Sequence, residues 1–559
     1  MNKENKVWLV NALEYMICFF ALSITKSEYS VYCCISIFLI MTISFSAEKY
    51  IKNRNQILLL NVIHSVQICV VYNELNYLKQ FSIYGTVSLI LESILYLAVL
   101  FTFFCTFVFV FKVQWLFLIN SICFGLFLVF SLPVKSAPDE LAHIYTSYNL
   151  SNQILDIDDG EDVFSIREGD QSLLSLPIEF ENSLEVMDEY YELSSGTLTD
   201  ITLTLEKSNC LNGNIPAYVM SALGISVGRI CNLNAFWTLT LGRFFNLAQY
   251  IVLVYFAITV MPYSKYLPMA VALLPIAMQQ GMSYSYDSLV IALSIFVICG
   301  SLGYKYNDNL NGRQKLLLGI FVIITSCILF SLKSHSYIFI AISPIIIELS
   351  DKSLFKKFWS FIEKMILFGM FLLVIYMVMY MVFHLGPFFA EPNNPIAWKG
   401  GVQGYTIQYF FNKPLDFIAV FINTFFRFSP FYLGSSTSYD LGWLNIQTPI
   451  IFILLFLIIC YLSTEPKCSN YLNATEKRYY AFSVVITIFC ILFIFLISYT
   501  PKDEKVILGA QGRYFIPLFV PGFLVMSPKT VQFQKIHSYI PVIYSILIMS
   551  FSLFLITRF

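Results

Sequence analysis

Charged side chains are scarce in this sequence. Asp, Glu, Lys and Arg make up 12% of the 559 residues, whereas hydrophobic residues make up 58%. Soluble globular proteins carry about 25% charged residues, so half of the expected charge is missing. The composition excludes a disordered chain, a secreted disulfide scaffold and a nucleic-acid-binding protein. It indicates a membrane protein with many spans.

Motifs for metal ligation and nucleotide chemistry are also missing. The thirteen cysteines form no metal-type pairs, and most lie in apolar runs, where Cys behaves as a small hydrophobe. Only Cys210 and Cys231 lie in a hydrophilic stretch where a disulfide could form. The five histidines show no metal-ligand spacing, and the chain has no P-loop, dinucleotide turn or nucleophile elbow. Cytosolic nucleotide chemistry is therefore not expected.

Long apolar runs predict the membrane spans, each of which needs about 20 apolar residues. The runs lie near 7–24, 29–47, 56–73, 82–111, 114–132, 236–260, 265–280, 286–303, 315–332, 336–349, 360–385, 447–463, 479–499, 512–527 and 537–556. The first run lacks a signal-peptide cleavage site, so we expect it to be retained as a helix. We predict an all-α polytopic integral membrane protein with about 13–15 transmembrane helices.

The positions of Lys and Arg predict the orientation, because cytoplasmic loops retain these residues. With the N-terminus inside, basic loops alternate correctly across all the predicted spans. The long polar stretches 133–235 and 386–446 then lie outside, as does the loop 500–511. We therefore expect a multi-pass plasma-membrane protein with a cytoplasmic N-terminus and an extracytoplasmic active site.

The chain divides into five segments on this basis. They are N-terminal helices (1–132), an acidic extracytoplasmic loop (133–235), a transmembrane core (236–385), a second extracytoplasmic loop (386–446) and C-terminal helices (447–559). The acidic loop holds 17 of the 35 Asp and Glu residues but only 4 Lys or Arg. We expect most of 156–206 to be a solvated loop.

The most informative string is SLPVKSAPDELAHIYTSYNL, directly after the fifth predicted span. Asp139, Glu140 and His143 follow Pro138, which can occupy the first turn of a helix. On a helix, Asp139 and His143 would share a face. One carboxylate could act as a general base while its neighbour tunes its pKa or holds a cation. An ordinary acidic helix start is the alternative reading.

A second polar string, LLPIAMQQGMSYSYDSLVIAL, forms an outer turn between two predicted spans. Its amides and hydroxyls, with Tyr284, Tyr286 and Asp287, could line a carbohydrate or phosphate site. The alternative is a capped turn in which Asp287 opens the next helix.

Two arginines lie where a lipid phosphate could be bound. Arg513, beside Gly509 and Gly512, is placed where the chain re-enters the membrane, and an Arg there can hold a phosphate bidentately. An interfacial Arg that snorkels is the alternative. Arg243 lies ~10 Å inside its span, where facing lipid would cost ~2.5–3.5 kcal/mol. We therefore expect Arg243 to face a polar cavity.

Weaker candidates lie elsewhere. Lys333 and His335 occupy an outer turn, and Glu92 lies in the middle of a predicted span. Trp443 and Asn445 could stack against and hydrogen-bond a sugar, although Trp is common at membrane interfaces without a ligand.

Five strings occur in the order typical of one family: PDELAHIY, LGRFFNL, PIAMQQGMSYSYDSL, NKPLDF followed by LGWLN, and GAQGRYFIPL. Together they resemble the bacterial membrane-protein family called domain of unknown function 2142, over roughly residues 115–530. The first four predicted spans look like an addition in front of the family core. Asn445 stands where the family pattern leads us to expect Asp, which puts a catalytic role at that position in doubt.

That family looks like a distant relative of the GT-C glycosyltransferases, which use polyprenyl-phosphate sugars and carry an essential acid on the first large outer loop. The resemblance places that acid at Asp139, with Glu140 beside it. It implies an inverting transfer from a polyprenyl-phosphate-linked sugar to a cell-envelope glycan at the surface of the lipid bilayer. The resemblance and the motifs together give these candidate substrate contacts: His143, Arg243, Tyr284, Tyr286, Asp287, Lys333, Gln511, Arg513 and Tyr514.

Two alternatives to a transferase remain, and the sequence leaves open whether a divalent cation is bound. The alternatives are an envelope polysaccharide polymerase or ligase, which would need no first-loop acid, and a non-enzymatic transporter or flippase of lipid-linked glycans. Transporters tend to show inverted repeats and charged midplane helices. The sequence shows no repeat, and its polar motifs gather at one face. Asp139 and Glu140 could also hold a divalent cation, Mg or Mn.

Overall fold

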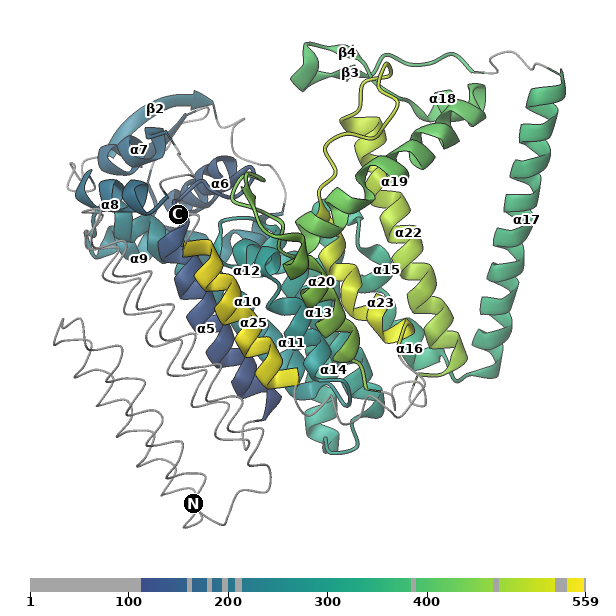
Figure 1. The fold of residues 1–559 in the computed structure, drawn as a ribbon, viewed down its shortest axis with the longest axis horizontal. Helices are drawn as coiled ribbons and strands as arrows, with labels where there is room; N and C mark the ends of the chain where they lie inside the picture. The colour runs from purple at the N-terminus through teal and green to yellow at the C-terminus, as the bar shows by residue number, and fades with distance from the viewer. Residues whose placement is uncertain are drawn as a thin grey trace.

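The computed structural model describes residues 112–157, 163–177, 183–193, 200–206, 214–383, 389–465, 472–527 and 540–556 (Figure 1). The predicted spans near 7–24, 29–47, 56–73 and 82–111 lie outside these residues, and so do Glu92 and Cys210. Their predicted roles, including a disulfide between Cys210 and Cys231, stay predictions.

Long apolar helices dominate the described residues. Seven are long and apolar enough to cross a membrane: α5 (Val113–Ser131), α10 (Ala235–Val260), α13 (Asp287–Tyr306), α14 (Gly312–Ser331), α17 (Ser353–Phe383), α19 (Pro414–Thr437) and α22 (Ala474–Ser498). Six of them fall on predicted apolar runs. The prediction of an all-α polytopic membrane protein is confirmed.

Three of the predicted spans are broken by proline. The run 265–280 forms α11 (Tyr266–Ala272) and α12 (Pro275–Met282), and the run 336–349 forms α15 (Ile338–Ala341) and α16 (Ser343–Leu349). The run 512–527 begins as the 3-10 helix η5 (Gly512–Leu518) and continues as α23 (Phe519–Val525). Proline lacks the backbone donor that a continuing helix needs, and it disfavours helical geometry in the preceding residue.

The two remaining C-terminal runs form shorter helices. They are α20 (Ile450–Leu462) and α25 (Ile540–Ile556).

The segment 386–446, expected to be an outer loop, contains α18 (Ile407–Asn412) and the long helix α19. Short hairpins flank them: β3 (Pro395–Ile396) with β4 (Val402–Gln403), and β5 (Asp440–Leu441) with β6 (Ile446–Gln447). The 3-10 turn η4 (Ala397–Lys399) lies between β3 and β4. The polar residues scattered along α19 interrupt its apolar pattern, so the sequence reading did not find this helix.

The acidic segment is folded where it is described, instead of being the solvated loop that we expected. It contains α6 (Glu140–Ile154), β1 (Val163–Arg167), α7 (Glu168–Ser175), α8 (Ser183–Leu193), β2 (Asp200–Glu206), η2 (Ile215–Ala217) and α9 (Val219–Ile230), with β1 antiparallel to β2. Arg167 and Asp170 form a buried ion pair at 2.8 Å. Arg167 also donates to the carbonyl of Leu233 and to the hydroxyl of Thr238. These hydrogen bonds connect the acidic segment to α10, which contains Thr238.

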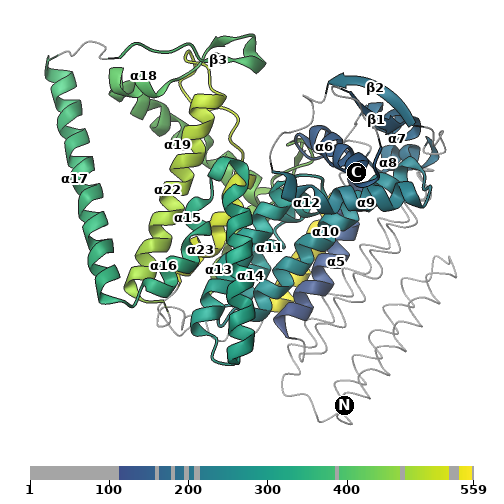
Figure 2. The same ribbon diagram turned by 180° about the vertical axis from the view of Figure 1, so that it is seen from behind.

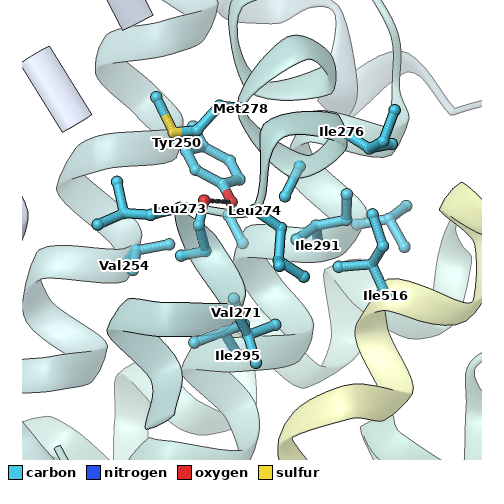
Figure 3. Packing of buried hydrophobic residues seen from close by; sticks show 14 of the residues in the cluster. Tyr250, Val254, Val271, Leu273, Leu274, Ile276, Met278, Ile291, Ile295 and Ile516 are labelled. Carbon is cyan, nitrogen blue, oxygen red and sulfur yellow. Dashed lines mark hydrogen bonds between the residues drawn. The ribbon is translucent and has the colours of Figure 1, made fainter. Parts of the chain in front are cut away.

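Buried apolar side chains of α10, α11, α12, α13 and η5 pack together in the core. Figure 3 shows side chains from these elements meeting around Tyr250, whose hydroxyl donates to the carbonyl of Ala272 at 2.7 Å. By contrast, α17 stands apart from the other helices in both views (Figures 1 and 2), and its side chains are exposed except for a few such as Trp359. The apolar core therefore includes α13 and η5, the two elements that begin with Asp287 and Gly512.

Candidate functional site

Four charged residues from four separate segments meet at one end of the helical core. Lys333 Nζ lies 2.5 Å from Asp287 Oδ1, and Arg513 Nε lies 3.2 Å from Asp287 Oδ2. Arg513 Nη2 also lies 3.3 Å from Asp139 Oδ2. We call these residues, Asp139, Asp287, Lys333 and Arg513, the cation cluster. All four were candidates from the sequence, and the fold brings them together.

The cation cluster is held by the ends of helices. Asp287 is the first residue of α13, and Asp139 immediately precedes α6 with a left-handed backbone (φ 62°). Lys333 begins η3 (Lys333–His335), in which three successive residues have positive φ. Such backbone conformations cost free energy and need support from the surroundings. The side-chain oxygen of Asn214 provides some, because it accepts from the Lys333 amide at 2.7 Å.

Arg513 is fixed by close packing of the residue before it. The Gly512 amide donates to the Ser435 hydroxyl at 2.9 Å. A Cβ at Gly512 would lie 2.2 Å from the carbonyl oxygen of Tyr432, so no larger residue fits against the end of α19. This contact sets the position from which the Arg513 side chain reaches Asp287.

Aromatic side chains surround the cation cluster. Lys333 Nζ lies 3.5 Å from the ring centroid of Tyr514 and 5.1 Å from that of Tyr286. The rings of Tyr286 and His143 meet edge to face with centroids 5.0 Å apart, and His143 Nδ1 lies 2.9 Å from the Tyr218 hydroxyl. Tyr286, Tyr514 and His143 therefore belong to the same site.

The buried part of the cluster carries more positive than negative charge. Lys333 and Arg513 are both largely buried, and the one buried acid between them is Asp287, 3% exposed. The second acid, Asp139, has a side chain that is 61% exposed. The pKa of His143 is lowered to about 3, mainly by burial and also by Arg513 and Lys333, against an opposing effect of Asp287, so this ring is neutral. The site could therefore bind an anion that takes the place of the exposed Asp139 carboxylate beside Arg513.

Glu140 and Arg243 form a second buried group beside the cluster. Arg243 binds both carboxylate oxygens of Glu140, at 2.8 and 3.1 Å. Arg243 also donates to the carbonyls of Leu132 and Pro133 at 2.6 and 2.7 Å. This arginine therefore joins α10 to the chain between α5 and α6.

The remaining donors to Glu140 are backbone amides. Those of Tyr284 and Ala137 donate to its two oxygens at 3.1 and 3.2 Å. The Tyr284 side chain is fully buried, and its hydroxyl donates to the carbonyl of Leu239 at 2.7 Å. The polar atoms of Glu140, Arg243 and Tyr284 are thus engaged within the protein.

A divalent cation does not fit the donor set that the structure provides. Both oxygens of Glu140 accept from Arg243, and Asp139 is paired with Arg513. Within the described ranges, no three His, Cys, Asp or Glu side chains are grouped so that they could hold a metal ion. Asp139 and Glu140 are therefore engaged by arginines and are not arranged as ligands for a divalent cation.

Two other candidates lie outside the cation cluster. His335 is exposed, and its Nδ1 lies 2.6 Å from the carbonyl oxygen of Phe330. Gln511 precedes η5, and its side-chain oxygen is buried with no hydrogen-bond partner among the residues that the structure describes.

The sequence reading missed Tyr218, Asn214 and Asp440. Asn214 and Tyr218 lie far along the acidic segment from Asp139, and only the folded layer brings them to the site. Asp440 stands in the YDLGWLN string, from which only Trp443 and Asn445 were predicted as candidate sugar contacts. Each of these three is a polar residue beside an apolar run in the sequence, and this pattern is the signal that could have marked it as a site residue.

The comparisons with known proteins identify a family and nothing closer. No curated protein and no solved structure matches the chain. The family described as predicted membrane protein DUF2142 matches residues 122–521. This range contains every residue of the cation cluster, together with Glu140 and Arg243. The chain belongs to the DUF2142 family of predicted membrane proteins.

Proposed function

We propose that this protein is a membrane glycosyltransferase that moves a sugar from a polyprenyl-phosphate donor to a cell-envelope glycan at the extracytoplasmic face. One observation carries the proposal: two buried cations, Lys333 and Arg513, share one buried acid, and Arg513 also pairs with one exposed acid, at the end of an apolar helical core. A lipid phosphate at the membrane surface has the charge and the location to complete this site.

The donor phosphate would bind Arg513 and Lys333. The planar guanidinium can hold two phosphate oxygens at once, and the ammonium adds a point charge. Asp139 is the acid that the phosphate would displace, because its contact with Arg513 is long, at 3.3 Å, and its side chain is mostly exposed. Asp287, buried between both cations, would stay and hold them in place.

Donor binding would release Asp139 to act as the base. Its carboxylate would take the proton of an acceptor hydroxyl, whose oxygen then forms a bond to the anomeric carbon. The bond from that carbon to the phosphate oxygen breaks, and its electron pair leaves with the polyprenyl phosphate. Arg513 and Lys333 would stabilise this departing charge. A single displacement of this kind inverts the anomeric centre.

Glu140 and Arg243 would act as positioning residues in this scheme. They fix the chain that carries Asp139. Arg243 binds the carbonyls of Leu132 and Pro133 before Asp139, and it also binds Glu140, which directly follows Asp139. Tyr286, Tyr514 and His143 would exclude water from the phosphate. Tyr284 would support the turn before Asp287.

Binding of a polyprenyl phosphate tests the proposal directly. The purified protein in lipid nanodiscs should bind undecaprenyl phosphate and should not bind undecaprenol, which lacks the phosphate. The Asp139→Asn variant should retain this binding, because Asp139 competes with the phosphate for Arg513. Equal binding of the alcohol and the phosphate, or none of either, would contradict the proposal.

We expect this binding to weaken at alkaline pH. The pKa of Lys333 is lowered to about 8, mainly by burial, with Asp287 opposing the shift and Arg513 adding to it. Lys333 is therefore charged below pH 8 and loses its charge as the pH rises through that value. The dissociation constant for undecaprenyl phosphate should rise about tenfold between pH 7 and pH 9. Titration at a series of pH values measures this change.

The Lys333→Met variant is the control for the pH dependence. It should bind weakly at pH 7 and show little further loss at pH 9. A wild-type affinity that stays constant across this range would mean that Lys333 does not contact the phosphate.

A further inference from the structure

We infer that the hairpin formed by β5 and β6 binds the acceptor glycan, with Asp440 accepting hydrogen bonds from its hydroxyl groups and Trp443 stacking on a sugar ring. This inference rests on the proposed transferase function and names the group that recognises the second substrate.

Asp440 is a buried carboxylate without a hydrogen-bond partner on one of its oxygens. The side chain is 5% exposed, and its Oδ2 is buried without a partner among the described residues. The buried acids Asp287 and Glu140 differ in this respect, because each is bound by a basic side chain. A buried acceptor left unpaired costs free energy, so a ligand that supplies donors would be bound there.

The electrostatics of Asp440 agree with a neutral ligand. Burial raises the pKa of this carboxyl to about 6, and no cationic side chain of the described residues pairs with it. The group is ionised at neutral pH and lacks a counter-ion, so it favours hydroxyl donors and repels acidic groups. A sugar with free hydroxyls fits, whereas a uronic acid or a phosphate does not.

The hairpin is fixed to the site by its neighbours. The Gln279 side chain makes two hydrogen bonds to Gly442, donating to its carbonyl at 2.9 Å and accepting from its amide at 3.0 Å. Gln279 lies on α12, which leads to Asp287. Asp440 also follows Ser435 by five residues, so their Cα atoms are at most ~18 Å apart, and Ser435 bonds to the residue before Arg513.

Trp443 adds an exposed aromatic surface to the same hairpin. Its side chain is 46% exposed, and the turn that presents it has positive φ at Gly442 (64°) and Leu444 (67°). Non-glycine residues adopt this backbone at a cost. An exposed indole on the same hairpin as a carboxylate oxygen that no described residue pairs combines the apolar face and the polar acceptor that a pyranose ring needs.

The experiment compares matched variants in cells that lack the endogenous gene. Asp440→Asn and Trp443→Ala are each expressed beside Asp503→Asn and Trp398→Ala, which change an exposed acid and an exposed Trp outside the hairpin. The envelope glycan is measured by sugar composition. Undecaprenyl phosphate binding and thermal unfolding are measured on the purified proteins in nanodiscs.

We expect Asp440→Asn and Trp443→Ala to lower the transferred sugar at least tenfold, while phosphate binding and the thermal midpoint match wild type. The two controls should restore the glycan fully. If Asp440→Asn restores it as well as wild type does, or if it loses phosphate binding or stability together with transfer, the inference is wrong. If wild type itself restores no glycan, the proposed transferase function fails instead.

Discussion

Replacing Arg513 by Lys is expected to lower both undecaprenyl phosphate binding and sugar transfer by about 100-fold. Arg513 donates from Nη1 to the carbonyl of Pro138 and from Nη2 to Asp139, so its planar group presents donors from two nitrogens at once. Lysine keeps the charge but loses the fork that matches a phosphate. Removal of a positioned donor at a site of developing negative charge costs about 10²–10³ in rate.

A matched variant separates this effect from a general loss of charge. Arg427 lies exposed on α19, so Arg427→Lys makes the same chemical change away from the cation cluster. It should bind the lipid phosphate and transfer sugar as wild type does. If Arg513→Lys behaves like Arg427→Lys, the guanidinium does not hold the phosphate.

Replacing Glu140 by Gln is expected to destabilise the protein by about 3–5 kcal/mol, the typical cost of leaving a buried charge without its partner. Arg243 would then keep only the carbonyls of Leu132 and Pro133, in a place where it is almost fully buried. The chain before Asp139 would lose its anchor as well. A lower midpoint of thermal unfolding in nanodiscs measures the change, and activity should fall with stability.

The exposed pair of Glu363 and Arg478 is the control for this prediction. Its atoms also lie 2.8 Å apart, but the side chains of Arg478 and Glu363 are 50% and 33% exposed. Glu363→Gln should therefore cost about 1 kcal/mol or less. A double variant of Glu140→Gln with Arg243→Gln should recover part of the loss, because no charge is left alone. A Glu140→Gln protein as stable as Glu363→Gln would show that the buried pair is not an anchor.

Much of the site could be predicted from the sequence because polar residues stand out against apolar runs. Asp139, Asp287, Lys333 and Arg513 each border a predicted span, and the structure brings them within ion-pair distance. The spans themselves follow from composition, as the bounds of α5, α10 and α13 show.

The pairing of these residues could not be predicted, since it depends on long-range geometry. Asp139 and Glu140 are neighbours in sequence, yet one is mostly exposed and the other is fully buried against Arg243. The left-handed backbone at Asp139 turns the two side chains in different directions. Asp440 could not be predicted, because its distinguishing feature is a buried oxygen with no hydrogen-bond partner among the described residues, and only the structure shows this.

Chemical analysis of the cell envelope tests the central claim, that this protein transfers a sugar at the cation cluster. A deletion strain is complemented with wild type or with Arg513→Lys at equal expression, and the sugar composition and linkages of the envelope glycans are compared. The account predicts that one sugar substituent disappears in the deletion, returns with wild type and stays absent with Arg513→Lys. An unchanged glycan in the deletion strain would contradict it and would favour a transporter of lipid-linked glycans.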